Sequence, residues 1–503
     1  MTLDPDAAYL VLAARDARYD GRLFVGVTST GVYCRPICRV RTPMRRNCRF
    51  FDTPAQAEAA AFRPCLKCRP EIAPGSGLPW TVMDASRTLA RQAALALDAQ
   101  SASGDAPNLA ALAAKLGVSD RHLRRIFSAE HGVTPMQYLQ TRRLLLAKQL
   151  LTDTPLPMTQ VALASGFGSL RRFNAAFAGT YRMSPSRLRS TAYPGAPTTA
   201  AQVRRKSGPS PIDDSVSVLL GYRAPYDVAA LLKFFAQRSV PGVETVAAQG
   251  IRRSVRAGSI GAAAGWIEAS FDAESPRVRV RLSATLVPDS GQVLQGVRRW
   301  LDLDASPQAI DEALCELPGA PGLRLPGSLD AFELAVRAVL GQQITVAGAR
   351  TLATRFIGRF GTPLATPWPD VDRSFPAPAA IARAPVERIA ELGIVRQRAA
   401  ALVALARAWP VLEPLLQERG SPEPLIDALC ELPGFGPWTA HYIAMRALGW
   451  PDAFPPRDVA LLNALRNGFG IGTQREADTR AQAWRPWRSY AVLRLWNTLE
   501  KTS

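Results

Sequence analysis

Four cysteines near the start of the chain have the spacing of a metal site. Three residues separate Cys34 from Cys38 and, 26 residues later, two residues separate Cys65 from Cys68. Two close pairs of thiols on either side of a domain-sized loop suit tetrahedral zinc, which contributes directly to the folding of a small domain. Buried free cysteines and a redox pair are the alternatives. Cys48, the odd thiol of the segment, is expected to fill the small core.

Basic side chains surround these cysteines and recur in a second segment. Between Cys34 and Arg69 the chain has nine basic and two acidic side chains, and between Lys115 and Arg189 it has twelve basic and three acidic ones. The two segments therefore contribute +7 and +9 of the net charge of +19. Such local positive charge is typical of a nucleic-acid surface, and a generally basic, solvated surface is the alternative.

Cysteine placement and the first residues predict a cellular compartment. Five of the seven cysteines lie within Cys34–Cys68, which favours a metal site in a reducing environment over a disulfide framework. The opening "MTLDPDAAYLVLAARD" lacks a basic segment followed by an apolar core, so it is not expected to be a signal peptide. No uninterrupted apolar run reaches about eighteen residues. The sequence predicts a cytoplasmic protein without a membrane span.

A second candidate for chemistry lies near the other end of the chain. The stretch "LCELPGFGPWTAHYIAMRAL" predicts a helix, a turn containing Gly434 and Gly436, and another helix. Backbone amides of such a hairpin can hold a phosphate without reading a base, although an ordinary interhelical turn is the alternative. About twenty residues later, Asp458 begins a helix in "AFPPRDVALLNAL". A lone carboxylate there could act on a substrate or simply cap the helix.

The second basic segment predicts two helix-turn-helix units. In "NLAALAAKLGVSDRHLRRIFSAEHG" and "MTQVALASGFGSLRRFNAAFAGTYRMSPSRLR", apolar side chains face inward at helical spacing. The intervening "TPMQYLQTRRLLLAKQLLTDT" predicts a helix of about 30 Å, which would hold two recognition helices near the repeat of a major groove. A protein-binding helical bundle is the alternative. The polar side chains predicted to face DNA are Arg121, Arg124, Ser169, Arg171, Arg172 and Asn174.

These patterns divide the chain and predict a multidomain α+β protein. We expect a small zinc-bound α/β domain, an all-α double helix-turn-helix domain, and a small antiparallel β domain packed on an all-α helix-hairpin-helix core. A flexible linker rich in Pro, Ser, Thr and Ala separates the halves. The predicted segments are 1–76 (zinc), 77–104 (connection), 105–190 (helix-turn-helix), 191–215 (linker), 216–300 (β domain) and 301–503 (helical core).

The stretches "DGRLFVGVTSTGVYCRPICRVRTPMRRNCRFF" and "FRPCLKCRPE" resemble the N-terminal domain of Ada-type adaptive-response proteins. The resemblance implies one zinc ion on the four cysteines, with Cys34 also accepting a methyl group from a methylphosphotriester in DNA. It places backbone contacts at Thr30 and Arg41, for which a solvated surface role is the alternative. Methylating one of four thiolates changes the zinc site from −2 to −1. Because this site then repels phosphate less, DNA affinity is expected to rise by about a kilocalorie per mole or more.

Residues 105–190 resemble AraC-type regulators, and "GFGSLRRFNAAFAGTYRMSPSRLR" is close to their signature. The resemblance implies sequence-specific binding of double-stranded promoter DNA, with RNA polymerase as a partner in activation. The spacing of the two recognition helices favours a monomer that reads two successive grooves. Together with the cytoplasmic prediction, the resemblance implies a bacterial, nucleoid-associated protein.

The block from about Tyr222 to Trp496 resembles AlkA-type 3-methyladenine DNA glycosylases of the helix-hairpin-helix superfamily. The resemblance is carried by "APYDVAALLKFFAQRSVPGVETV", "GLRLPGSLDAFELAVRAVLGQQITV", the hairpin, the Asp458 segment and "WRPWRSYAVLRLW". It implies that Asp458 is the catalytic carboxylate, that the enzyme needs no cofactor, and that Gln343 holds the intercalating position. It also implies a base pocket formed by Trp438, Tyr442 and Trp487.

Three departures from related families limit the predicted chemistry. Glycosylases that also cut the strand have a lysine where this chain has Trp438, so we expect base removal without lyase activity. Gln343 replaces the leucine of the AlkA type, which leaves the lesion preference open. The sequence has no Pro-Cys-His-Arg motif, so repair of O6-methylguanine is not predicted.

Three functional hypotheses follow. The favoured one is a protein that is both a methylation-activated regulator and an alkylpurine glycosylase. In the second, the chain is only a regulator, and the glycosylase fold is a non-catalytic DNA-binding platform. In the third, the chain is an enzyme that its front half localises on DNA.

Overall fold

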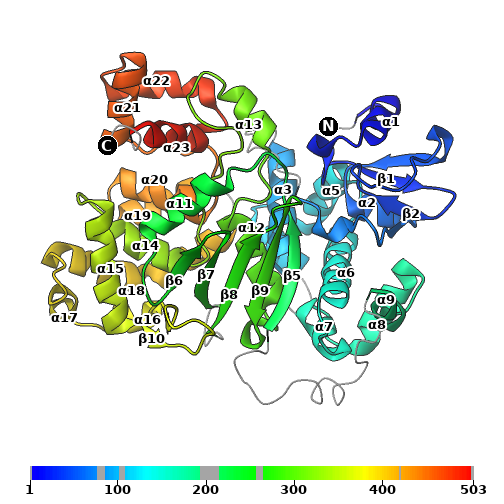
Figure 1. The fold of residues 1–503 in the computed structure, drawn as a ribbon, viewed down its shortest axis with the longest axis horizontal. Coiled ribbons are helices and arrows are strands. Elements are labelled where there is room, and N and C mark those ends of the chain that lie inside the picture. Colours follow the sequence, from blue (N-terminus) through cyan, green and yellow to red (C-terminus); the bar gives the residue numbers. More distant parts are fainter. Residues whose placement is uncertain are drawn as a thin grey trace. The chain divides into compact units, whose positions relative to one another are not determined.

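The computed structural model describes residues 3–75, 85–100, 108–192, 215–256, 264–418 and 421–499 (Figure 1). These residues form two compact units. The first holds residues up to 223 together with 272–295, and the second holds 224–271 and the residues from 296 onward. The predicted linker 191–215 lies almost entirely outside the described residues, while the predicted connection 77–104 contains a helix, α3 (Ala85–Gln100).

The N-terminal part of the first unit is a small sheet with the strand order β3-β1-β2-β4. Strand β1 (Phe24–Val27) runs antiparallel to β2 (Val32–Cys34) and β3 (Cys48–Phe51), and β2 runs parallel to β4 (Arg63–Pro64). Phe24, Tyr33, Ala57 and Phe62 form one core cluster. The accompanying helices are α1 (Pro5–Ala14), η1 (Ala17–Tyr19), η2 (Arg45–Asn47), α2 (Pro54–Ala59) and η3 (Pro70–Ile72).

Two helix-turn-helix units follow, as the sequence predicts. Ser119 and Ser169 cap the second helix of each unit, accepting hydrogen bonds from backbone amides of the first turn. The long helix between the units has a capping box formed by Thr134 and Gln137. The helices are α4 (Leu109–Lys115), α5 (Asp120–His131), α6 (Pro135–Asp153), α7 (Met158–Ala164), α8 (Leu170–Tyr181) and α9 (Pro185–Ala192).

The first unit also holds two strands of the predicted β domain. Strand β5 (Ser215–Gly221) pairs antiparallel with β9 (Arg277–Ser283). Two side chains of α6 bind the backbone of Leu219 on β5. The side-chain amide of Gln149 donates to the Leu219 carbonyl at 2.6 Å, and the Leu219 N–H donates to the Asp153 carboxylate at 3.1 Å. These bonds satisfy backbone groups of β5. After β9 come η4 (Ala284–Leu286) and α12 (Ser290–Trp300).

The second unit combines an antiparallel meander with a large helical core. The meander consists of β6 (Glu244–Ala247), β7 (Gly250–Arg256) and β8 (Ala264–Phe271). A two-stranded ribbon pairs β10 (Thr362–Pro363) with β11 (Arg373–Ser374). The helices are α11 (Val228–Arg238), α13 (Pro307–Ala313), α14 (Ala331–Leu340), α15 (Val346–Phe360), α16 (Pro378–Ala382), α17 (Val386–Ala390), α18 (Arg396–Glu418), α19 (Glu423–Cys430), α20 (Pro437–Ala447), α21 (Val459–Phe469), α22 (Gln474–Ala481), η5 (Gln482–Trp484) and α23 (Arg488–Leu499).

The fold class predicted from the sequence is confirmed. One helix meets the hydropathy criterion for a membrane span although its apolar side chains lie in a protein core. Within α18, Arg396–Leu416 has the length and the mean hydropathy (1.4) of a membrane span. Its apolar side chains, among them Leu402, Leu405 and Ala406, are buried in the core of the second unit. A core helix of a globular domain meets the same criterion, so this helix is weak evidence for a span.

Candidate functional site

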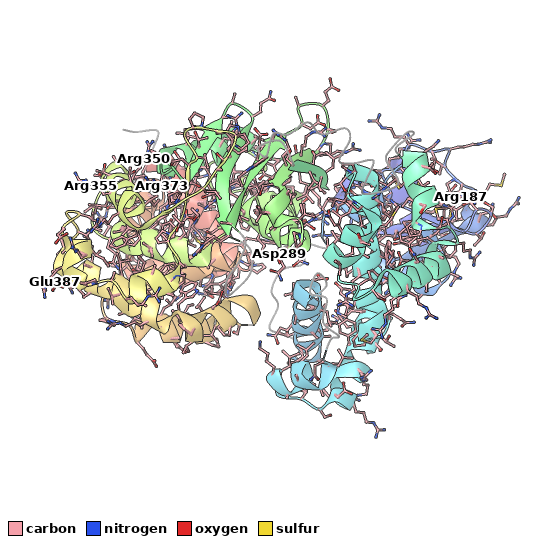
Figure 2. All side chains as sticks on the ribbon, turned by 90° about the horizontal axis from the view of Figure 1, so that it is seen from below. Arg187, Asp289, Arg350, Arg355, Arg373 and Glu387 are labelled. Carbon is pink, nitrogen blue, oxygen red and sulfur yellow. The ribbon has the colours of Figure 1, made fainter. Side chains whose placement is uncertain are left out.

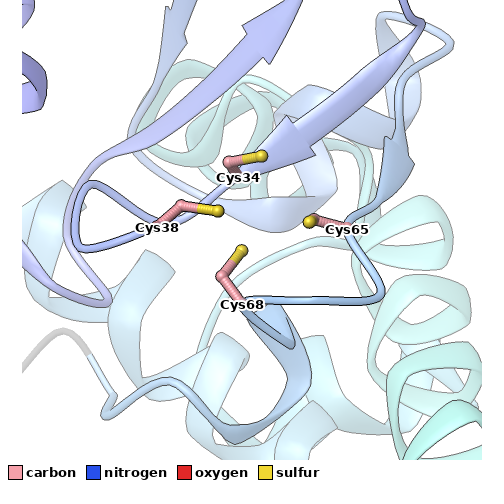
Figure 3. Close-up of side chains that lie close together, drawn as sticks. All are labelled: Cys34, Cys38, Cys65 and Cys68. Atoms are coloured by element: carbon pink, nitrogen blue, oxygen red, sulfur yellow. The ribbon is translucent and has the colours of Figure 1, made fainter. Parts of the chain in front are cut away.

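The sulfur atoms of Cys34, Cys38, Cys65 and Cys68 converge on one point (Figure 3). All four lie within 4.8 Å of one another, and three of the four residues are buried. Zinc–sulfur bonds of about 2.3 Å in a tetrahedron place the sulfurs roughly 3.8 Å apart. The donor set therefore fits one zinc ion after a small contraction. Cys34 ends β2, and the Cys65 amide donates to the carbonyl of the neighbouring Tyr33 at 3.0 Å, which ties the two halves of the cluster together.

The arginines near the cluster have two different roles. Arg35 is buried, and its guanidinium pairs with Asp20 and donates to the Cys68 carbonyl at 3.0 Å. Its backbone N–H lies 3.4 Å from the Cys68 sulfur, where it can stabilise a thiolate. By contrast, Arg41 and Thr30 are exposed, as a contact with a DNA backbone requires. Only part of the basic segment can therefore face a nucleic acid.

Cys48 lies apart from the four-sulfur cluster. Its side chain packs with Leu12 and Val25, and its thiol lies 3.4 Å from the Met44 carbonyl. Burial raises the pKa of this thiol, and the charge of Arg45 opposes the shift. These contacts agree with the expected core-filling role. Leu12 and Val25 also line a small, mostly apolar cavity together with Cys34 and Cys38.

The predicted DNA-facing side chains of the helix-turn-helix units are exposed. On α5, Arg121 is exposed, while Arg124 donates to Asp120 at 2.9 Å within its own helix. The hydroxyl of Ser169 accepts from a backbone amide as the cap of α8, so its first role is structural. The exposed face of α8 holds Arg171, Arg172 and Asn174, and Arg187 extends from α9 (Figure 2).

In the second unit, the hairpin between α19 and α20 has the conformation that a glycine turn requires. Gly434 has φ = +83°, and a Cβ at this position would lie 3.0 Å from the Cβ of Ala401. Gly436 caps α20 with an extended backbone (φ = −104°) and open space around it. Gly434 is exposed and Gly436 is partly exposed, so amides here can reach a phosphate.

Asp458 is both a helix cap and the centre of an aromatic site. One carboxylate oxygen accepts from the Leu461 amide at 2.8 Å and caps α21. The other accepts from the indole N–H of Trp438 at 2.7 Å, and the indole of Trp496 lies 3.4 Å from the first oxygen. Asp458 is only 5% exposed. Capping and chemistry are therefore not alternatives, since one oxygen caps the helix while the other faces an indole.

Tyr442 and Trp438 lie one turn apart on α20. Their rings are stacked, with centroids 5.3 Å apart and an interplanar angle of 7°, and the ring of Trp496 lies 6.4 Å from that of Tyr442. Arg446 donates to the Tyr442 hydroxyl at 2.7 Å. Burial raises the pKa of Tyr442, but Arg446 and other nearby arginines outweigh burial and lower it. A stacked aromatic surface therefore lies beside the carboxylate.

The third aromatic ring beside Asp458 is Trp496. Trp487, selected from the sequence, is buried and packs edge-on against Tyr490 at 5.8 Å. Trp496 lies in the stretch "WRPWRSYAVLRLW", as Trp487 does, and sequence reasoning missed it. The helical period of α23 was the available signal, but it does not show which tryptophan approaches another helix.

Gln343 occupies a strained turn that is fixed to the hairpin. Its φ is +56°, uncommon for a residue with a side chain, and it is exposed. The preceding Gln342 donates to the Gly434 carbonyl at 2.9 Å and to the Thr439 hydroxyl at 3.1 Å. The following helix, α15, carries the exposed Arg350 and Arg355 (Figure 2). The turn at Gln343 and the hairpin are thus held together on one side of the second unit.

Four known families match successive parts of the chain. The metal binding domain of Ada matches residues 7–71, and a helix-turn-helix domain matches residues 112–191. The AlkA N-terminal domain matches residues 217–330, and the HhH-GPD superfamily base excision DNA repair protein matches residues 336–489. The family resemblances predicted from the sequence are confirmed.

Individual relatives show how the parts combine. The probable bifunctional transcriptional activator/DNA repair enzyme AlkA of Mycobacterium tuberculosis is 36% identical, over 99% of this chain and 97% of the relative. DNA-3-methyladenine glycosylase 2 of Escherichia coli is 38% identical over 56% of this chain and 96% of its own length. The bifunctional transcriptional activator/DNA repair enzyme Ada of Escherichia coli is 34% identical over 28% of this chain and 37% of its own length. The chain therefore belongs to the family of bifunctional transcriptional activators and DNA repair enzymes of the AlkA type.

Proposed function

We propose that the second unit removes alkylated purines such as 3-methyladenine from DNA and that Asp458 is its catalytic carboxylate. The observation that carries this proposal is a buried carboxylate with one oxygen beside the indole of Trp438, which is itself stacked on Tyr442. Enzymes that act on a base must first take it out of the duplex stack. Gln343 would fill the space that the flipped nucleotide leaves, and the hairpin with Gly434 and Gly436 would hold the strand.

The arrangement suits hydrolysis of an N-glycosidic bond to a cationic base. An alkylated purine carries positive charge and leaves readily, so the enzyme has little need to protonate it. Aromatic faces attract such a cation, and Tyr442 and Trp438 provide them, with Trp496 proposed as the third ring. As the bond breaks, positive charge develops on the sugar. Asp458 would stabilise this charge or assist the attack of water. Trp438 supplies no amine for a Schiff base, so strand cleavage is not part of the proposal.

The test of this site is single-turnover release of 3-methyladenine from alkylated duplex DNA by Asp458→Asn. We expect a loss of about a hundredfold or more, comparable to the loss of one preorganised electrostatic group. Asp227→Asn is the matched control, because Asp227 also caps a helix in this unit by accepting from a backbone amide at 2.9 Å. Unchanged release by Asp458→Asn would leave the regulator-only hypothesis, in which the glycosylase fold is a DNA-binding platform.

In the first unit, we propose that Cys34 accepts a methyl group from a DNA methylphosphotriester, once and irreversibly. The sulfur–carbon bond forms as the bond between the methyl carbon and the phosphate oxygen breaks, and the electron pair remains on the phosphodiester. A zinc ion held by the four sulfurs keeps them as thiolates at neutral pH. Arg41 and Thr30, both exposed, would contact the strand during the reaction.

Methyl transfer would then act as a switch for promoter binding. Loss of one negative charge at the cysteine site reduces its repulsion of phosphate, and the exposed side chains of α5 and α8 read the major groove. The residues proposed for this contact are Arg121, Arg124, Ser169, Arg171, Arg172 and Asn174. We further propose that the protein is a monomer in the bacterial cytoplasm, that it associates with the nucleoid, and that it contacts RNA polymerase during activation. The domain boundaries predicted from the sequence are proposed as well.

The mass of the Cys34 peptide after incubation with methylated DNA tests this switch, together with promoter affinity before and after. We expect a gain of one methyl group that Cys34→Ser abolishes and Cys48→Ser retains, because Cys48 packs in the core outside the cluster. Methyl uptake without a change in promoter affinity would favour the hypothesis that the front half only localises the enzyme on DNA.

A further inference from the structure

The zinc domain and the helix-turn-helix domain share a buried polar cluster within the first unit. Its centre is Glu58 on α2, whose carboxylate accepts three hydrogen bonds. Tyr33 on β2 donates at 3.1 Å, Thr141 on α6 at 2.8 Å, and Tyr181 at the end of α8 at 3.3 Å. We call these four residues the Glu58 cluster. Each donor comes from a different element, so one carboxylate joins the zinc domain to both the long helix and the second recognition helix.

A second set of buried charges fixes the same two domains. Lys148 on α6 pairs with Glu71 on η3 at 2.5 Å, and both side chains are at most 1% exposed. Arg69 pairs with Asp153 at the end of α6 at 2.6 Å. Removing one member of such a pair leaves a buried charge without compensation, which is costly. The two domains are therefore held in one orientation rather than sliding over an apolar surface.

The Glu58 cluster begins one residue from the proposed methyl acceptor. Successive side chains of a strand point to opposite faces, so Cys34 and Tyr33 lie on the two faces of β2. Cys34 points into the sulfur cluster on one face (Figure 3), and Tyr33 bonds to Glu58 on the other. Tyr33 is fully buried and packs edge-on against Phe24. A displacement of β2 at Cys34 therefore moves a hydroxyl that Glu58 holds.

At its other end, the Glu58 cluster enters the core of the second helix-turn-helix unit. Tyr181 is 3% exposed and packs against Phe177 at 4.7 Å, which in turn packs against Phe173 at 5.6 Å. These aromatic rings lie on the inner face of α8, whose outer face carries the proposed DNA-reading side chains. The position of α8 is thus tied, through one hydroxyl and one carboxylate, to the strand that ends in Cys34.

We propose that the Glu58 cluster transmits the state of the cysteine site to α8, so that methylation of Cys34 changes promoter affinity through contact as well as through charge. This inference rests on the proposed methyl switch and goes beyond it, because a purely electrostatic switch needs no contact between the domains. Glu58 and Tyr181 are then positioning residues: they touch neither DNA nor the methyl group, and they set the orientation of the helix that reads the promoter.

The test compares Tyr181→Phe with Tyr138→Phe. Both tyrosines donate to a carboxylate, but Tyr138 bonds to Asp98 on α3, outside the zinc domain, at 3.3 Å, and so serves as the matched control. Methyl uptake, zinc content and promoter affinity are measured for each full-length protein. We expect Tyr181→Phe to take up the methyl group at the wild-type rate, while the methylation-dependent gain in promoter affinity falls to less than half of the wild-type factor. Tyr138→Phe should keep the full gain.

A second measurement does not depend on methylation. Hydrogen exchange of the α8 amides is followed before and after zinc is removed with a chelator. Zinc removal unfolds the zinc domain and so releases Glu58, which should speed exchange in α8 of the wild type and of Tyr138→Phe. Tyr181→Phe and Glu58→Leu already lack the bond between Glu58 and α8, so zinc removal should speed their exchange at most half as strongly.

The outcomes separate the inference from the function on which it rests. If Tyr181→Phe and Glu58→Leu keep the full methylation-dependent gain and the normal exchange response, the inference is overturned and the switch is electrostatic alone. If the wild type takes up no methyl group, or gains no affinity from it, the proposed switch is wrong. The exchange response alone then decides whether the Glu58 cluster couples the two domains.

Discussion

The cysteine site draws its four donors from one short stretch of chain in the first unit, whereas the Asp458 site in the second unit collects side chains from α20, the start of α21 and α23. We expect the first to depend on a bound metal ion for its stability, because a small domain has only a small core to hold four thiols together. The second is held by the large helical core that surrounds it. A site made by a bound ion and a site made by packing should therefore fail under different treatments.

Metal removal should show the largest difference between the two sites. A structural zinc ion accounts for about 10 kcal/mol or more of folding free energy in small domains. We expect chelation to unfold the first domain, with loss of near-ultraviolet circular dichroism from Tyr33 and Phe24, and to leave release of 3-methyladenine within about twofold. If chelation abolished base release as well, the second unit would depend on the first, and the contrast between the two sites would be wrong.

The second-largest expected effect is a pH dependence of the stability of the first unit, caused by Glu58. Burial is the main cause that raises the pKa of Glu58 to about 7, and hydrogen bonds from Thr141, Tyr33 and Tyr181 and the charge of Lys148 only partly oppose it. The unfolded chain releases this proton near pH 4.5 and the folded chain near pH 7, so the folded state binds the extra proton between these values. Stability should therefore fall as the pH rises from about 4.5 to about 7.

Glu58→Gln lacks the titrating carboxyl group and should not show this loss of stability as the pH rises. We expect its stability relative to the wild type to increase between pH 5 and pH 7.5 by at most about 3 kcal/mol. Chemical denaturation of both proteins across this range is the measurement, and other titrating groups cancel in the difference between the two. A constant difference would contradict the raised pKa of Glu58.

The second unit should respond to loss of the indole donors around Asp458. Trp438→Phe keeps an aromatic ring but removes the N–H that lies 2.7 Å from the carboxylate. A hydrogen bond to a charged group is worth about 1.5–3 kcal/mol, so base release should slow by roughly ten- to a hundredfold. Trp496→Phe should slow release less, since its indole lies at 3.4 Å. Trp487→Phe should change release less than about twofold, and a larger loss there would support the predicted place of Trp487 in the base pocket.

The contrast between sites made from one short stretch of chain and sites made from distant elements also explains what the sequence could predict. The cysteine cluster, the two helix-turn-helix units and the hairpin are short patterns whose spacing carries their structure, and the structure contains all of them. Asp458 could be predicted as a catalytic candidate because its segment resembles a family motif. Trp496 and Glu58 were not identifiable, because each depends on which faces of distant elements meet. Arg35 shows the same limit: it belongs to the basic segment around the cysteines, but its side chain is buried and paired with Asp20, which the sequence does not reveal.

The smallest expected effect concerns the hairpin, where two glycines two residues apart differ in their need for glycine. Gly434→Ala places a side chain at φ = +83° and 3.0 Å from Ala401, which should cost about 1–2 kcal/mol. Binding of undamaged duplex DNA should weaken by the corresponding factor of roughly 5–30. Gly436→Ser is the matched control, because its backbone is extended, its surroundings are open and serine caps helices well. Fluorescence anisotropy with labelled duplex measures both. If both variants lost the same DNA affinity, the hairpin would require open space beside the DNA strand rather than the left-handed turn.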